Sequence, residues 1–109
     1  MSRIDLHAHT DHSDGTVTPT ALVRLAREVG LSLLAVTDHD TTSALTEAQA
    51  EGRALGVEVL VGCEISTRIP EGNVHVLGYG FDPADPAFQR FLAGVREARE
   101  RRNDRMFDK

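Results

Sequence analysis

Apolar residues in this chain form short runs with the length and composition of β-strands. Nearly continuous runs at residues 31–37 and 57–61 are typical of strands that are covered on both faces. A further strand is expected over 73–81. The connection that precedes this strand is too short for a helical crossover, and Pro70 and Gly72 predict a hairpin or an irregular turn there. We therefore expect a sheet that is parallel at first and distorted at its fourth strand.

Between these strands, apolar positions recur at helical spacing. Thr18-Pro19 is a typical start of a helix, with a capping hydroxyl before proline, and Gly30 is a typical stop. A second helix is expected over 41–55. Asp85-Pro86 predicts the start of a third helix, which continues to the end of the chain. Alternating strands and helices predict the α/β class with one domain over residues 1–109.

The composition is that of an ordinary globular domain and excludes several classes of protein. Hydrophobic residues make up 40% and charged residues 27% of the 109 positions, which argues against disorder. No apolar run approaches the roughly 20 residues that span a bilayer, and the N-terminus lacks a signal pattern. We therefore expect a cytoplasmic protein. Cys63 is the only cysteine, which excludes an internal disulfide, and we expect it to be a buried strand residue.

The net charge of −5 does not exclude an anionic substrate. Bound divalent cations are often the largest local charges in a site, and three of them would more than offset this charge. The acidity of the chain is therefore compatible with a metal-dependent site that binds phosphate.

Residues able to bind metal follow each predicted strand. His7 and His9 leave the first strand on the same side, and His39 and Glu64 come after the next two. The carboxyl ends of parallel strands share one face of an α/β fold, and in barrels this face holds the active site. We therefore expect a metal cluster, with candidate ligands from all four strands and the first loop: His7, His9, Asp14, His39, Glu64 and His75.

The last helix carries arginines on its apolar stripe. Turning 100° per residue from Phe88, the stripe passes Phe91, Leu92 and Val95 and then reaches Arg99 and Arg102. An arginine directed at the interior usually has an anionic partner. We expect one or both arginines to bind a substrate phosphate; the alternative is that the stripe leaves the core here and the side chains extend to water.

The motifs D-L-H-x-H-T, H-S-D-G-T, T-D-H-D, G-C-E-I and V-H-V-L-G-Y-G, in this order, resemble the first half of a PHP-domain (polymerase and histidinol phosphatase) phosphoesterase. They most resemble the bacterial enzymes that hydrolyse 3′,5′-nucleoside bisphosphates or the ends of short oligoribonucleotides. The resemblance implies the N-terminal portion of a distorted (β/α)₇ barrel, similar to a TIM barrel. It also implies two or three divalent metal ions, with manganese the first expectation and iron, zinc or magnesium the others. The same six ligands follow, with Glu64 as the bridge between two ions, and Arg99, Arg102 and Asn103 match an R-x-x-R-N stretch of similar sequences.

Metal-assisted hydrolysis is the mechanism that fits such a site, and it needs no protein nucleophile. His12 could donate a proton to the leaving group or hold a phosphate, or be a loop residue without a role. Three carboxylates close to the ligands could orient them from outside the cluster: Asp5, Asp38 and Asp40.

Four alternatives to a nucleotide phosphoesterase remain open. They are a PHP module of a DNA polymerase, in a proofreading or structural role, a histidinol phosphatase, an amidohydrolase and an inactive metal-binding fragment. Many amidohydrolases use a modified lysine, and Lys109 is the only lysine here. The late family motifs are absent. We therefore expect the rest of the barrel to come from a longer enzyme or from a second chain, and we expect the 109 residues alone to be a doubtful catalyst.

Overall fold

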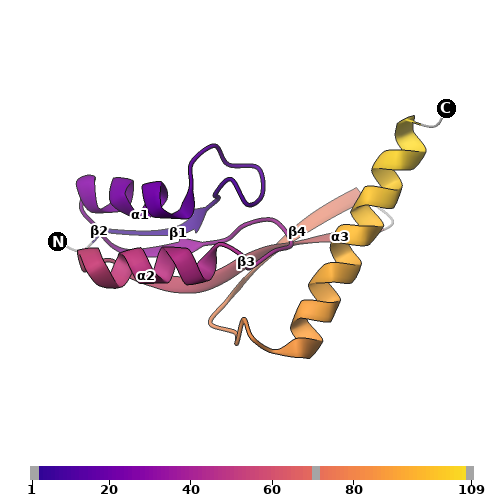
Figure 1. The fold of residues 1–109 in the computed structure, drawn as a ribbon. Helices are drawn as coiled ribbons and strands as arrows, with labels where there is room; N and C mark the ends of the chain where they lie inside the picture. The colour runs from indigo at the N-terminus through magenta and orange to yellow at the C-terminus, as the bar shows by residue number, and fades with distance from the viewer. Residues whose placement is uncertain (1–2, 70–71, 108–109) are drawn as a thin grey trace.

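The structure is a computed structural model that describes residues 3–69 and 72–107. Two α-helices and three parallel strands alternate first, and a hairpin and a long helix follow (Figure 1). In chain order the elements are β1 (Arg3–Ala8), α1 (Pro19–Glu28), β2 (Leu31–Val36), α2 (Leu45–Leu55), β3 (Glu58–Ile69), β4 (Gly72–Tyr79) and α3 (Pro86–Phe107). The predicted α/β class is thus confirmed.

The four strands form one sheet in the order β1-β2-β3-β4. β1, β2 and the first part of β3 are parallel, whereas β4 runs antiparallel to β3. The short connection before β4 therefore makes a hairpin, as its length and turn residues predict. Tyr79 at the end of β4 donates its hydroxyl to the carbonyl oxygen of Leu6 on β1, 2.5 Å away, which draws the two outer strands of the curled half-barrel together.

Helices α1 and α2 lie side by side over one face of the parallel strands, and the core lies between them and the sheet (Figure 1). Its centre is formed by Val23 of α1, Leu34 and Val36 of β2 and Ala48 of α2, each at most 1% exposed. α1 begins as predicted, because the hydroxyl of Thr18 accepts a hydrogen bond from the backbone N–H of Ala21 and Pro19 follows it.

Helix α2 is shorter than the spacing of its apolar residues predicts. It begins at Leu45, and the expected start at residue 41 is wrong. The side chain of Thr41 instead bonds to Ser43, accepting from its backbone N–H and donating to its hydroxyl. Local bonds of this kind compete with the helical backbone pattern. The helix ends as expected at Gly56, which adopts the left-handed conformation (φ 76°).

Strand β3 is longer than expected, so Glu64 lies within the strand and not after its end. Residues 58–61 of β3 pair with β2, and residues 62–69 pair with β4. The second ladder keeps the chain extended beyond the apolar run that marks the strand in the sequence. As a result Glu64 is held at the middle of a rigid element.

Helix α3 buries fewer of its apolar residues than its apolar stripe predicts. Leu92 is fully buried, and Phe88 packs against Phe81 with ring centroids 4.4 Å apart. Phe91 is 54% exposed, so its predicted burial is wrong. The helix extends away from the sheet at the end of the molecule opposite α1 and α2 and has few neighbours along its length (Figure 1). Among the described residues, no helix is both long enough and apolar enough to cross a membrane.

Candidate metal centre

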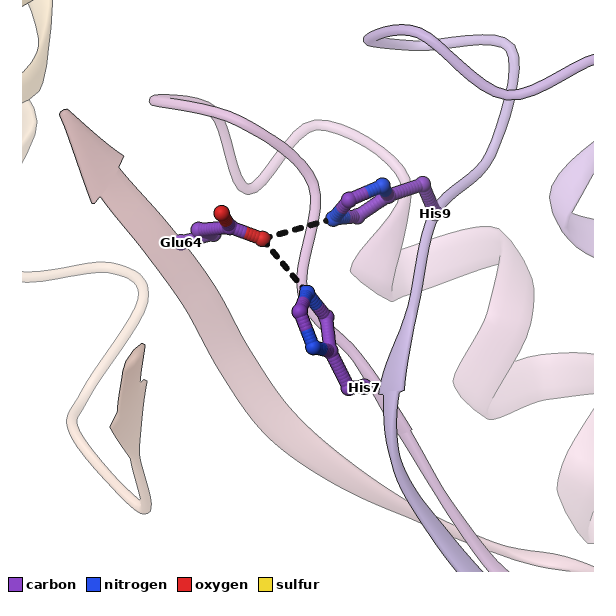
Figure 2. Close-up of side chains that lie close together, drawn as sticks. All are labelled: His7, His9 and Glu64. Carbon is purple, nitrogen blue, oxygen red and sulfur yellow. Dashed lines mark hydrogen bonds and ion pairs between the residues drawn. The ribbon is translucent and has the colours of Figure 1, made fainter. Parts of the chain in front are cut away.

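The end of β1 directs two imidazoles at one carboxylate oxygen. His7 and His9 are two residues apart, so their side chains emerge on the same side of the extended chain. The Nε2 atoms lie 2.6 Å (His7) and 2.9 Å (His9) from Oε1 of Glu64 on β3 (Figure 2). These three side chains form the first group of candidate ligands.

The loop after β1 adds a second carboxylate. Asp14 lies between two imidazoles, with Oδ1 3.0 Å from Nδ1 of His9 and Oδ2 3.0 Å from Nε2 of His39. His9 thus faces Glu64 with one ring nitrogen and Asp14 with the other. A second group of candidate ligands, next to the first, follows from this arrangement.

His75 approaches Glu64 from β4, the strand that flanks β3 on the side away from β1 and β2. Its Nδ1 lies 2.8 Å from Oε2 of Glu64, and Nδ1 of His39 lies 3.8 Å from the same oxygen. The four imidazole rings follow one another across the sheet, with successive centroids 5.1, 4.4 and 5.4 Å apart in the order His7, His9, His39, His75. This completes the third group.

The structure thus brings together all six residues predicted as ligands. In each group the candidate ligand atoms lie within 4.8 Å of one another, and the groups are His7–His9–Glu64, His9–Asp14–His39 and His39–Glu64–His75. Four imidazoles and two carboxylates form a donor set that suits manganese, iron or zinc. Because Glu64 belongs to two groups and offers a different oxygen to each, it has the geometry of a bridging ligand.

The charges around Glu64 stabilise its ionised form. Burial by itself would raise the pKa of this carboxyl group, but hydrogen bonds from His7, His9 and His75 and the charge of His39 outweigh that effect and lower the pKa to about 2. The carboxylate is therefore ionised throughout the physiological range, as a metal ligand must be.

The three carboxylates expected to orient the ligands have different neighbours. The exposed Asp5 accepts the backbone N–H of His7, 3.0 Å away. Asp38 is buried and accepts three hydrogen bonds from the loop that carries Asp14. Asp40 is buried and contacts β3 and α3. The Asp5 carboxylate thus contacts the backbone of the candidate ligand His7, whereas Asp38 and Asp40 bond to the backbone of Glu64 through their own backbone groups.

His12 lies in the same loop as Asp14 and is fixed by a hydroxyl group. Its Nδ1 is 2.7 Å from the hydroxyl oxygen of Ser43, and its Nε2 is 4.0 Å from Asp11. The side chain is 31% exposed, so part of the ring is accessible to a ligand or to water.

Arg99 is the predicted phosphate-binding residue whose side chain the structure describes. Its Nη1 donates to Oδ2 of Asp40 at 2.8 Å, and 40% of the side chain is exposed. Its anionic partner in the structure is thus a carboxylate of the chain itself. Arg102 and Asn103 lie on α3, but their side chains are outside the described residues.

Two contacts of the site region were not predicted from the sequence, the ion pair of Asp40 with Arg99 and the hydrogen bond of Ser43 with His12. Asp40 and Arg99 are 59 positions apart. The signal that could have identified the pair was present: an acidic residue next to a candidate ligand and an arginine on an apolar helical stripe each need a counter-ion.

Comparison with known proteins gives matches over almost the whole chain. A family model described as "PHP domain" matches residues 5–99. The 3′,5′-nucleoside bisphosphate phosphatase of Chromobacterium violaceum is 42% identical over 106 residues, which are 97% of this chain and 37% of that protein. The 5′-3′ exoribonuclease Rnm of Escherichia coli is 43% identical over 103 residues, 93% of this chain and 34% of that enzyme.

Solved structures show the same fold. A Bifidobacterium adolescentis protein proposed to be a metal-dependent phosphoesterase superposes with a TM-score of 0.88 at 40% identity, over 96% of this chain and 37% of that one. The chain therefore spans little more than a third of the length of these relatives.

Proposed function

Because the chain belongs to the PHP domain family, we propose that it is the metal-binding N-terminal part of a metal-dependent phosphoesterase. The observation that carries this proposal is the convergence of six candidate ligands in three adjoining groups that share Glu64, His9 and His39. Several metal sites at the carboxyl ends of barrel strands are a recurrent arrangement for the hydrolysis of phosphate esters. The remaining strands would come from the rest of a longer protein or from a second chain.

In this proposal the six side chains hold two or three divalent ions, with Glu64 as the shared ligand. Manganese is the first expectation, and iron, zinc or magnesium are the others. Such ions supply an activated water and positive charge next to the phosphate oxygens. Asp14 and Glu64 provide the negative charge that keeps the cations in place, and the neutral imidazoles fill the other coordination positions.

Residues of α3 and of the first loop act on the substrate in this proposal. Arg99 offers its remaining N–H groups to a phosphate oxygen, and Arg102 and Asn103 of the same helix bind the substrate with it. His12 delivers a proton to the leaving oxygen, and the hydroxyl of Ser43 at 2.7 Å fixes the orientation of the ring.

The proposed substrate is a phosphate ester of a nucleotide, either a 3′,5′-nucleoside bisphosphate or the 5′ end of a short RNA. The names of the two similar enzymes, a nucleoside bisphosphate phosphatase and an exoribonuclease, support this class. The cytoplasm, where such substrates occur, is the proposed location.

Metal content and hydrolysis, measured on the same samples, test the proposal. The chain is purified without chelators and its metal is counted by elemental mass spectrometry. Release of phosphate from a 3′,5′-nucleoside bisphosphate, and of nucleotides or phosphate from a short 5′-phosphorylated RNA, is then followed. We expect at least two ions per folded chain, and we expect Glu64→Gln to lose at least one of them and to lower any hydrolysis by about 100-fold or more.

Glu51→Gln is the matched control, since Glu51 forms an exposed ion pair with Arg24 on the helices. It should keep the metal and the activity of the original chain. Unchanged metal content in Glu64→Gln would contradict the bridging role, and a folded chain without metal would contradict the proposal for these 109 residues.

A further inference from the structure

Asp40 combines two features that are unfavourable for a folded chain. Its carboxylate is fully buried, and its backbone has φ 57°, the only positive φ among the described residues other than glycine. A buried carboxylate and a left-handed conformation each cost free energy and persist where surrounding contacts compensate for them. The contacts of Asp40 explain how this residue is held.

On one side, Asp40 is joined to the strand that carries Glu64. Its backbone N–H donates to the carbonyl oxygen of Glu64 at 3.0 Å, and Oδ1 accepts the backbone N–H of Ser66 at 2.7 Å. The neighbouring His39 pairs with Glu64 as an isolated parallel bridge. Asp40 thus fixes the segment of His39 against β3 at the position of the shared ligand.

On the other side, Asp40 is joined to α3. Oδ2 accepts from Nη1 of Arg99 at 2.8 Å, and the Asp40 carbonyl oxygen accepts from Nη1 of Arg96 at 2.6 Å. On the same side of α3, Leu92 lies one turn before Arg96 and is fully buried. Gln89, about one further turn before it, donates to the hydroxyl of Thr42 at 2.8 Å. One face of α3 therefore lies along residues 40–42, directly after His39.

The ion pair leaves most of Arg99 available. A guanidinium has five N–H donors in a planar fork, and the described contact uses only one nitrogen of Arg99. With 40% of the side chain exposed, the remaining donors can reach a second anion. Asp40 thus holds one nitrogen of this fork, and the other N–H donors of Arg99 keep their capacity to bind an anion.

We propose that Asp40 is a positioning residue, which fixes Arg99 of α3 beside the ligands His39 and Glu64 so that the guanidinium is already oriented for an anionic oxygen of the substrate. This inference rests on the proposed function, because the anion is the phosphate of the ester that is hydrolysed. In this proposal Asp40 acts by orienting Arg99 of α3, and not by holding the imidazole ring of a metal ligand.

The first test needs no metal. The Asp40 amide donates to the carbonyl oxygen of Glu64, and the Glu64 amide donates to the carbonyl oxygen of Asp38. Hydrogen exchange of these two amides reports how firmly this segment is held. We expect Arg99→Ala to raise the exchange rate of both amides by about tenfold. Arg24→Ala removes a surface ion pair between α1 and α2 and should leave these amides unchanged.

The second test measures the affinity of the metal-loaded chain for inorganic phosphate by calorimetry. We expect Arg99→Ala to weaken binding by about tenfold or more, and Arg99→Lys to recover part of this loss. Asp40→Asn keeps an acceptor for Ser66 and tolerates a positive φ, but it removes the charge that faces Arg99. It should weaken phosphate binding in the original chain and have no added effect in the Arg99→Ala background.

If Asp40 had only a structural role, Asp40→Asn would lower the stability of the protein and leave the phosphate affinity of the folded protein unchanged. That result would overturn the inference. Equal effects of Asp40→Asn in both backgrounds would overturn it too, as would unchanged amide exchange in Arg99→Ala. If the original chain takes up no metal, the proposed function fails, and the exchange of the metal-free chain alone decides whether Arg99 and Asp40 hold the segment.

Discussion

At the scale of single residues, Glu64 is the carboxylate on which the candidate centre converges. Among the described residues it is the one carboxylate within reach of all four histidines of the cluster, His7, His9, His39 and His75, and it joins strands that are distant in the sequence. Without metal, the same contacts act as hydrogen bonds and ion pairs. The stability of the metal-free protein should therefore depend on the charge of this residue.

The first prediction concerns pH. The pKa of Glu64 in the folded protein is about 2, below its ordinary value of 4.5, since hydrogen bonds from histidines outweigh the effect of burial. A lowered pKa stabilises the folded state fully above pH 4.5, and this contribution is lost as the pH falls towards 2. We expect the free energy of unfolding of the metal-free chain, measured in urea, to fall between pH 4.5 and 2 by more than that of Glu64→Gln. Equal pH dependence in both proteins would show that Glu64 is not the group responsible, and Glu51→Gln is the control.

The second prediction concerns Cys63. Burial, followed in importance by the charge of Asp40, raises the pKa of its thiol to about 11. The thiol is therefore protonated at pH 8, and the thiolate is the reactive form. We expect a disulfide reagent to modify the folded chain at least about 100-fold more slowly than the chain in urea. Rapid, complete modification of the folded protein would contradict the burial of this side chain.

At the scale of elements, the loop between β1 and α1 is held by a carboxylate from beyond β2. Oδ1 of Asp38 accepts from the Thr10 N–H at 2.6 Å and the Ser13 hydroxyl at 2.8 Å, and Oδ2 accepts from the Thr10 hydroxyl at 2.7 Å. Asp14 follows directly on this loop. The position of one candidate ligand thus depends on a residue outside the three groups of candidate ligands.

The third prediction follows from these bonds. Asp38→Ala leaves three donors without their acceptor, at a cost of about 3 kcal/mol, which should lower the melting temperature by more than about 10 °C. In the fraction of Asp38→Ala molecules that remains folded, the candidate metal site that includes Asp14 should lose its ion. Asp82→Ala removes a single exposed acceptor in a loop and should change neither quantity by a comparable amount. Full metal content in folded Asp38→Ala would show that the loop is ordered without this carboxylate.

The same elements show how far the sequence predicts the structure. The convergence of the candidate ligands could be predicted because they lie on the apolar strands or in the segments that follow them, and helix starts such as Thr18-Pro19 depend only on local bonds. The length of β3 could not be predicted from its sequence, because its second half is held by pairing with β4 and not by its own apolar residues. The exposure of Phe91 was missed because periodicity gives the stripe of a helix but not how much of it finds a neighbour.

At the scale of the whole molecule, the described chain is longer in one direction than a compact domain of its size. Its radius of gyration is 15.2 Å, whereas a compact domain of this length has about 13 Å. Helix α3 extends from one end, while α1 and α2 cover the sheet at the other (Figure 1). In the described part of the chain, β1 pairs with β2 and β4 pairs with β3, so the outer edge of each of these two strands is open.

Apolar side chains accompany both open edges. Ile4 is 58% and Leu6 41% exposed on β1, and Val76 of β4 is 47% exposed. Ile4 and Leu6 share a face of the strand with Ala8, which packs against the core. Open edges with exposed apolar residues favour pairing with another strand. The 109 residues alone should therefore associate with one another.

The last prediction tests this association by light scattering after gel filtration over a range of concentrations. We expect the average mass to rise with concentration above that of a monomer, and we expect Ile4→Lys with Val76→Lys to reduce the rise, since charges on edge strands oppose pairing. Leu25→Lys is the matched control, because Leu25 is 49% exposed on α1, away from the edges. A chain that remains monomeric at every concentration, with metal bound, would mean that curling of the sheet through Tyr79 and Leu6 already protects the edges. Association that all three lysines reduce equally would instead point to net charge and not to the strand edges.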